Sequence, residues 1–124
     1  MVIAVDFDGT CVTHEYPRIG RYIGAQHILK RLVNEGHQLI LYTMRSGKEL
    51  ADAVAWFQEN KIELWGTNEN PEQKRWTQSP KIYTHLYIDD AALGIPLCKG
   101  LKGERLYVNW SEVEEMLFPA EEAA

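Results

Sequence analysis

The sequence lacks the features that mark several large classes of protein. Its two cysteines form neither a disulfide framework nor a Cys-x-x-Cys metal-binding pair, which favours a reduced, cytoplasmic setting. No apolar run approaches the roughly 20 residues that a membrane-spanning helix needs. The opening apolar run, residues 2–5, is too short for the core of a signal peptide. No Gly-x-Gly-x-x-Gly or P-loop pattern is present.

Positive charge is also scarce. Lys and Arg together number 13 against 18 Asp and Glu, which gives a formal net charge of −5. Because phosphate backbones are bound mainly by Lys and Arg, this balance argues against a nucleic-acid partner. A small phosphorylated substrate is still compatible with it, since a bound metal ion supplies positive charge of its own.

What is present is ordinary for a globular protein. Hydrophobic residues make up 45% and charged residues 25% of 124 residues, enough for one core. We predict a single domain over residues 1–118 and a frayed tail over residues 119–124.

Short apolar runs alternate with helical patterns along the chain. Four apolar runs predict buried strands: 2–5, 39–42, 62–65 and 86–88. Helical patterns are expected from Ala25, from a capping box at Ser46 and Glu49, and after Asn70-Pro71. A last strand at 106–108 and a helix capped by Ser111 and Glu114 complete the series. This order predicts an α/β protein with a three-layer, Rossmann-like fold and a mostly parallel sheet.

Polar side chains follow three of the predicted strands directly. Asp6 follows the first strand and Thr43 the second, while Asp89 and Asp90 follow the fourth. Ligands of parallel sheets bind beyond the carboxyl ends of the strands, so we expect these groups to converge. Crowded carboxylates need a cation to stay ionised, and oxygen ligands favour Mg²⁺. Alternatively, Asp6 and its neighbours only cap a turn.

Several motifs together resemble those of a known family. Asp6-Phe7-Asp8-Gly9-Thr10 resembles the first motif of the haloacid dehalogenase superfamily. Thr43 after its hydrophobic strand matches the second motif, Lys81 the third, and Asp89-Asp90 the fourth. The similarity spans nearly the whole chain in the family's order, which favours a small phosphatase-like member.

The resemblance implies a Mg²⁺-dependent phosphohydrolase acting on phosphoric monoesters. Asp6 would attack phosphorus and form an aspartyl-phosphate, and Asp8 would act as acid and then as base. The Asp6 carboxylate, the Asp8 backbone carbonyl and Asp89 would hold Mg²⁺. Asp90 would contact the metal directly, act through water or cap the next turn.

The resemblance also implies a phosphate-binding set. Thr43 and Lys81 would hold the phosphoryl oxygens, with Lys74 as the alternative lysine. Arg45 either contacts substrate or closes a surface ion pair. His14 lies in the loop where the family has a mobile flap, and it is either solvated or a substrate contact. Cys11 is expected to be a packed small residue.

No segment is long enough to form a cap domain. Residues 11–24 and 45–80 are each too short for a lid, so the site is expected to be open or covered by a second copy in a homo-oligomer. An open site suits a phosphorylated macromolecule, or a phosphorylated small molecule in an oligomer. A phosphotransferase, a non-catalytic phosphate- or metal-binding module and an enzyme of nucleic-acid ends remain alternatives.

Overall fold

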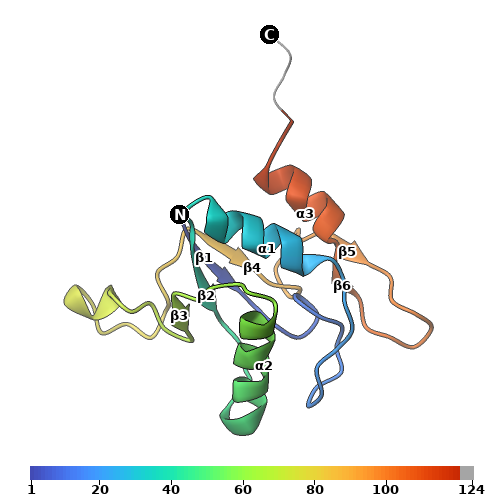
Figure 1. Ribbon diagram of the computed structural model, residues 1–124, viewed down its shortest axis with the longest axis horizontal. Coiled ribbons are helices and arrows are strands. Elements are labelled where there is room, and N and C mark those ends of the chain that lie inside the picture. The colour runs from blue at the N-terminus through green and yellow to red at the C-terminus, as the bar shows by residue number, and fades with distance from the viewer. Residues whose placement is uncertain (121–124) are drawn as a thin grey trace.

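Four parallel strands form the sheet on which the rest of the chain is arranged (Figure 1). The structure is a computed structural model, and it describes residues 1–120. The strands are β1 (Val2–Val5), β2 (Gln38–Leu41), β3 (Gly66–Thr67) and β4 (Leu86–Ile88). They lie in the order β3-β2-β1-β4, so β1 is central and directly contacts both β2 and β4. The predicted α/β class with a parallel sheet is confirmed.

Three α-helices pack against one face of this sheet. They are α1 (Ala25–Asn34), α2 (Gly47–Glu59) and α3 (Trp110–Leu117), and Figure 1 shows α1 crossing in front of the strands. Alternate strand residues face the helices, because successive side chains of a strand point to opposite faces. The main core combines these strand and helix residues: Ile3, Val5, Leu39, Leu41, Ile88, Ile28, Leu29, Leu32, Ala53, Phe57, Trp110 and Val113.

The other face of the sheet carries a much smaller apolar cluster. Its buried members are Val2, Ala4, Ile40 and Ile82, with Trp65 packed against them. None of these residues belongs to an α-helix, so the expected three-layer arrangement is not found in residues 1–120. We call this surface the helix-free face.

The segment between β3 and β4 explains the missing helical layer. It contains only the 3₁₀ helix η1 (Gln73–Arg75), which is the short helix that Asn70-Pro71 predicts but has a single turn of 3₁₀ type. Side chains hold this segment in place of a regular hydrogen-bond ladder. Gln73 bonds to the carbonyls of Ser79 and Lys81 and accepts from the Tyr83 N–H. A polar stretch held in this way has no apolar stripe with which to pack on the sheet.

Several predicted boundaries also shift. The third strand is β3 at Gly66–Thr67 and not at 62–65, because Ile62 packs into the main core instead. A strand that was not expected, β5 (Leu97–Cys98), pairs antiparallel with β6 (Tyr107–Val108). Neither predicted capping box forms: Ser46 makes no side-chain cap bond, and Asn109 caps α3 by accepting from the Glu112 N–H. Most of the predicted tail, 121–124, lies outside the described residues.

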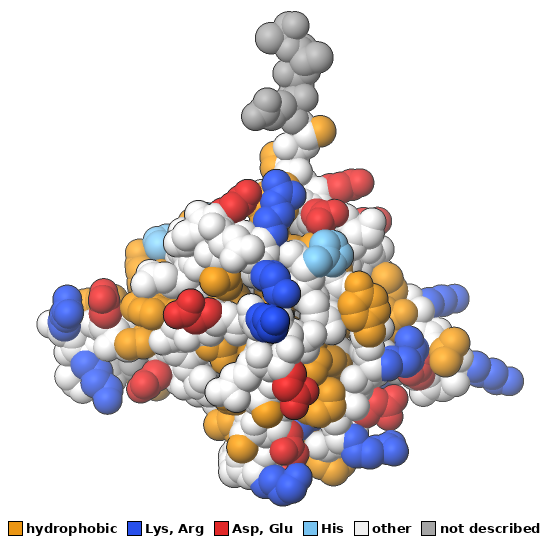
Figure 2. Space-filling view, viewed as in Figure 1, with side chains coloured by type: hydrophobic (Ala, Val, Ile, Leu, Met, Phe, Trp, Pro, Cys, Tyr) orange, Lys and Arg blue, Asp and Glu red, His pale blue; other side chains and the backbone are white. Residues whose placement is uncertain are grey.

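The surface charge and the lengths of the helices can be described directly. Figure 2 shows basic and acidic side chains interspersed on the viewed face of the described chain. Among residues 1–120, no helix combines the length and apolar character needed to cross a bilayer.

The last helix supports the loop that follows β1. The Trp110 indole N–H donates to the carbonyl of Thr10 at 2.6 Å, and the Val108 N–H donates to the carbonyl of Gly9 at 2.9 Å. Trp110 is only 2% exposed, so its hydrogen bond is shielded from water. The end of the described chain therefore holds the loop next to Asp6.

Replacing Trp110 should test this support. We expect Trp110→Phe to lower the free energy of unfolding by about 1–3 kcal/mol, because a buried carbonyl loses its donor and the core loses volume. Chemical denaturation measures this quantity. Trp76→Phe is the matched control, since Trp76 is 58% exposed and should shift stability little. Equal effects of the two substitutions would contradict the assignment.

Candidate active site

Three carboxylates meet at the carboxyl edge of the sheet. Val5 pairs with Ile88, and the Asp6 N–H donates to the Ile88 carbonyl at 3.0 Å, so Asp6 and Asp89 leave their strands side by side. Carboxylate oxygens of Asp6, Asp89 and Asp90 all lie within 4.8 Å of one another. The structure thus brings together acidic groups that are far apart in the sequence.

Thr10 links the two acidic segments. Its fully buried hydroxyl lies 3.0 Å from Asp6 Oδ2 and 3.3 Å from Asp90 Oδ1, and it accepts from the Asp90 N–H at 3.0 Å. A hydroxyl can donate one hydrogen and accept at once, so Thr10 bonds to one carboxylate while it accepts from the Asp90 backbone, and this ties the two segments together. Sequence reasoning placed Thr10 only in a turn and did not predict this role.

The loop after Asp8 requires glycine at one point. Gly9 has a φ of +80°, and a Cβ there would lie 2.0 Å from Nε2 of His14 and 2.6 Å from Oδ2 of Asp90. Any larger residue would therefore be strained in its backbone and would displace both groups. This glycine allows the loop to approach the acidic cluster closely.

His14 contacts the acidic cluster from this loop. Its Nε2 lies 2.8 Å from Asp90 Oδ2, and the His14 side chain is only 16% exposed. The sequence predicts that His14 is either solvated or a substrate contact. In the structure it is instead a hydrogen-bond partner of Asp90. No spacing pattern in the sequence signals this contact, which depends on the path of the loop.

The carboxylates perturb one another. Burial, and then the charge of Asp89, raise the pKa of Asp6 from 3.8 to about 7. Burial also raises the pKa of Asp89, with Asp90 adding to the effect. At Asp90 burial acts upward too, but hydrogen bonds from His14 and Asp6 leave its pKa below the ordinary value. Three such groups cannot all ionise cheaply without a cation.

This donor set fits a hard divalent cation. It offers carboxylate oxygens from two adjacent strands, which is the ligand type that Mg²⁺ and Ca²⁺ prefer. Asp8 does not contribute its side chain to the group, which leaves only its backbone carbonyl for the role that the resemblance implies.

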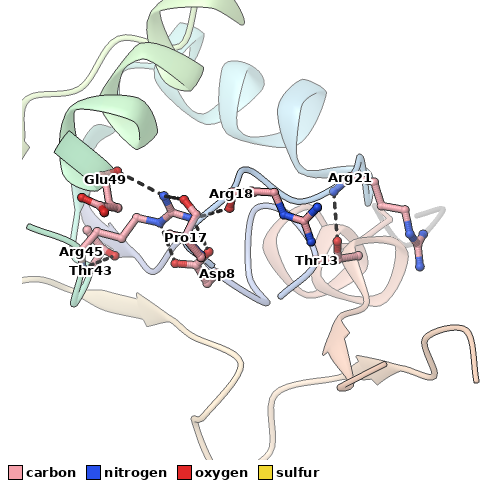
Figure 3. Close-up of polar contacts among 8 residues, drawn as sticks. All are labelled: Asp8, Thr13, Pro17, Arg18, Arg21, Thr43, Arg45 and Glu49. Carbon is pink, nitrogen blue, oxygen red and sulfur yellow. Dashed lines mark hydrogen bonds and ion pairs between the residues drawn. The ribbon is translucent and has the colours of Figure 1, made fainter. Parts of the chain in front are cut away.

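The Asp8 side chain instead forms a buried ion pair (Figure 3). Arg45 Nε and Nη2 donate to the two Asp8 carboxylate oxygens, each at 2.8 Å. The remaining Arg45 donors reach the backbone carbonyls of Pro17, Arg18 and Glu49. A guanidinium has five N–H groups, and all five are used here.

Two expectations about Arg45 are therefore corrected. Its side chain is 1% exposed, so the pair with Asp8 is not on the surface. It also has no N–H left for a substrate phosphate. The sequence showed only that Arg45 follows Thr43, whereas the fold turns its side chain towards the loop after β1. There it joins Asp8, the start of α2 and residues 17–18.

Thr43 lies at the same sheet edge, with a partner that was not predicted. Its backbone N–H donates to Asn68 Oδ1 at 2.8 Å, and its hydroxyl accepts from the Arg45 N–H at 3.1 Å. The Thr43 hydroxyl hydrogen is left free to donate. Asn68 directly follows β3, so correct placement of that strand would have pointed to it.

The candidate phosphate lysines line cavities other than the one that includes Asp6 and Asp89. Lys81 lines a cavity of about 540 Å³ on the helix-free face with Trp76 and Tyr83. Lys74 lines a cavity of about 180 Å³ that includes Asn68, the partner of Thr43. Asp6 and Asp89 line neither cavity, although Tyr87 lines both the Lys81 cavity and the one beside Asp6 and Asp89, so Lys81 stays a predicted phosphate ligand. A lysine ahead of β4 starts from the opposite end of the strand.

Cys11 packs beneath the site as expected. It is fully buried, and its thiol lies 3.2 Å from the Asp6 carbonyl. Burial, followed by the charges of Asp6 and Asp8, raises the pKa of this thiol well above its usual range. A protonated, inaccessible thiol is a poor nucleophile.

The fold and site define an α/β protein with an acidic centre at the carboxyl edge of its sheet. Comparison with protein-family models and with curated proteins finds no match. A solved structure of a conserved protein from Bacteroides thetaiotaomicron is similar, with 38% identity and a TM-score of 0.78. The similarity covers 94% of this chain and 88% of that one. The chain belongs to the same family as that conserved protein.

Removal of metal should make stability depend on pH. The pKa of Asp6 is higher in the folded protein than its ordinary 3.8, so its contribution to stability is complete at acid pH and is lost as pH rises through about 7. In chelator-treated protein we expect the melting temperature to fall between about pH 4 and about pH 7. Mg²⁺ should restore it most at the higher pH.

Asp6→Asn should remove most of this pH-dependent loss and weaken the effect of Mg²⁺. Asp52→Asn is a control, because Asp52 is an exposed partner of Lys48. Scanning calorimetry with and without chelator measures both effects. A metal response that is unchanged in Asp6→Asn would contradict the proposed ligand set.

The Arg45 hydrogen bonds should contribute to stability as well. Lysine keeps the charge but cannot form the paired bonds to Asp8 or reach three carbonyls, so we expect Arg45→Lys to cost about 1–3 kcal/mol. Arg18→Lys changes an 81% exposed side chain and should cost less than about 0.5 kcal/mol. Denaturant titration compares the two, and similar losses would argue against the buried pair.

Proposed function

We propose that this chain is a capless member of the haloacid dehalogenase superfamily and a Mg²⁺-dependent phosphohydrolase of phosphoric monoesters. The observation that carries the proposal is the carboxylate cluster of Asp6, Asp89 and Asp90 at the carboxyl edge of adjacent parallel strands. It coincides with the residues whose motifs resemble that superfamily. The TM-score and identity to the Bacteroides protein support the fold but name no activity.

Asp6 is the nucleophile in this mechanism. One of its carboxylate oxygens attacks phosphorus as the bond from phosphorus to the substrate alcohol oxygen breaks, which leaves an aspartyl-phosphate. Water then attacks the same phosphorus, releasing phosphate and restoring the Asp6 carboxylate. Thr10, whose hydroxyl bonds to Asp6 Oδ2, orients the attacking group.

Asp8 moves the protons in both steps. It gives a proton to the departing alcohol oxygen and later takes one from the attacking water. Both Asp8 oxygens are held by Arg45, so at least one of these two bonds must open when a substrate binds. Arg45 therefore acts as a positioning residue for Asp8 in this scheme.

Asp6, Asp89 and Asp90 would hold a divalent cation, which would supply positive charge against the phosphate dianion. The raised pKa values of Asp6 and Asp89 support this placement, because a nearby cation favours their ionised forms. Thr43 is placed to donate its hydroxyl hydrogen to a phosphoryl oxygen at the same edge.

Among the alternatives, a phosphotransferase would share the first step and differ only in the acceptor. A pure binding module needs metal ligands but has no use for Asp8 as a second acid held in a defined position. The presence of Asp8 two residues after Asp6 therefore favours an enzyme over a binding module.

Phosphatase assays on matched variants test the proposal. With Mg²⁺ and simple phosphomonoesters we expect Asp6→Asn to abolish turnover and Asp8→Asn to lower it by about 10²–10⁴-fold. Asp52→Asn, an exposed acid on α2, should retain turnover. Release of inorganic phosphate is measured, with and without added alcohols to reveal a phosphotransferase.

Trapping separates the two roles. Asp8→Asn should accumulate a base-labile phosphoryl group on Asp6, detectable as a mass increase that hydroxylamine removes. Turnover that survives Asp6→Asn at full rate would exclude the covalent route and, with it, the proposed function.

A further inference from the structure

The helix-free face continues directly into the acidic cluster. In the parallel register, Ala4 lies between Ile40 and Tyr87, and the next row of this face places Asp6 between Tyr42 and Asp89. Neighbouring strands are only about 4.8 Å apart, so the two tyrosines border the nucleophile. Asp6 therefore has an aromatic side as well as an acidic side.

A cavity occupies this position. It has a volume of about 230 Å³, and its wall includes Asp6 and Asp89 at the acidic side and Tyr42 and Tyr87 at the aromatic side. Ala4 lines it as well, and its single methyl group leaves room between the larger side chains. Its volume is below the usual 300–1,000 Å³ of drug-sized sites, so it suits one ring and a short linker.

The two tyrosines present their rings to solvent. Tyr42 is 40% exposed and Tyr87 42% exposed, although faces of parallel sheets are normally covered. Their ring centroids are 6.2 Å apart with planes tilted by 44°, so neither ring covers the face of the other. The Tyr87 hydroxyl donates to the Ile82 carbonyl, which fixes the direction of that ring.

The charge of the cavity wall restricts the kind of substrate group that can bind there. The described wall of the cavity contains two carboxylates and no Lys or Arg, so a negatively charged substituent on the ring would be repelled. Exposed aromatic faces favour planar partners in stacked or edge-to-face contact, worth more than area burial alone. An uncharged flat ring meets both conditions.

We propose that the substrate carries an uncharged planar ring next to its phosphate, and that this ring binds on Tyr42 and Tyr87 in the cavity beside Asp6. The inference rests on the proposed function for the position of the phosphate. It assigns specificity to the helix-free face, a surface that the resemblance to phosphatases does not use. In this proposal the substrate ring binds on the helix-free face, where a helix would otherwise cover the sheet.

Binding of unreactive analogues tests the ring without any turnover. Calorimetry in the presence of Mg²⁺ compares phenylphosphonate with cyclohexylphosphonate, whose ring is of similar size and at least as apolar but not flat. We expect the phenyl compound to bind about fivefold or more tightly, because only it can stack on tyrosine. Hydrophobic burial alone would predict no such preference.

Matched variants locate the effect. Tyr42→Leu and Tyr87→Leu keep apolar bulk but remove the ring, and each should reduce the phenyl preference by about two- to fivefold. Tyr42→Phe keeps the ring and should retain the preference. Tyr83→Leu is the control, because Tyr83 is an exposed tyrosine that lines only the neighbouring cavity with Lys81.

The outcomes separate this inference from the proposed function. A phenyl preference that is lost in the two leucine variants and kept in Tyr83→Leu supports the aromatic subsite, even if no phosphate is released from any ester. No binding, no preference, or a preference equally lost in Tyr83→Leu overturns it. Turnover of methyl phosphate with no preference for phenyl compounds would leave the phosphatase proposal standing alone.

Discussion

The crowding of three carboxylates at one edge of a parallel sheet is the constraint on which the site depends. Asp6, Asp89 and Asp90 are partly buried and close enough to raise the pKa of two of them. Hydrogen bonds from Thr10 to Asp6 and between His14 and Asp90 stabilise part of this negative charge. A bound cation would neutralise the remainder. The loop after β1 approaches these carboxylates at Gly9, and Arg45, which follows β2, holds that loop through Asp8 and the carbonyls of Pro17 and Arg18.

Sequence reasoning reached the parallel sheet and the acidic cluster because both follow from local patterns. Apolar runs locate β1, β2 and β4, and the polar residues that follow them must share an edge. It did not reach the role of Arg45 or His14, since each depends on the direction of a side chain across a loop. The third strand was misplaced because Ile62 reads as strand but packs with the helices.

The missing helical layer could not be predicted from the segment's polarity alone. Residues after β3 show a cap signal at Asn70-Pro71, yet Gln73 bonds to carbonyls further along the chain and stops the helix after one turn. The bare face that results has two opposite consequences. It lowers the apolar area that the sheet buries, and it leaves the rings of Tyr42 and Tyr87 beside Asp6.

The contact between Trp110 and Thr10 also sets an order of assembly. During synthesis the segment from Asp6 to Thr10 leaves the ribosome first, and Trp110, whose indole supports it, follows about 100 residues later. The nascent chain therefore holds its acidic residues without their final scaffold until α3 emerges. The acidic centre therefore reaches its final form only after α3 has been synthesised.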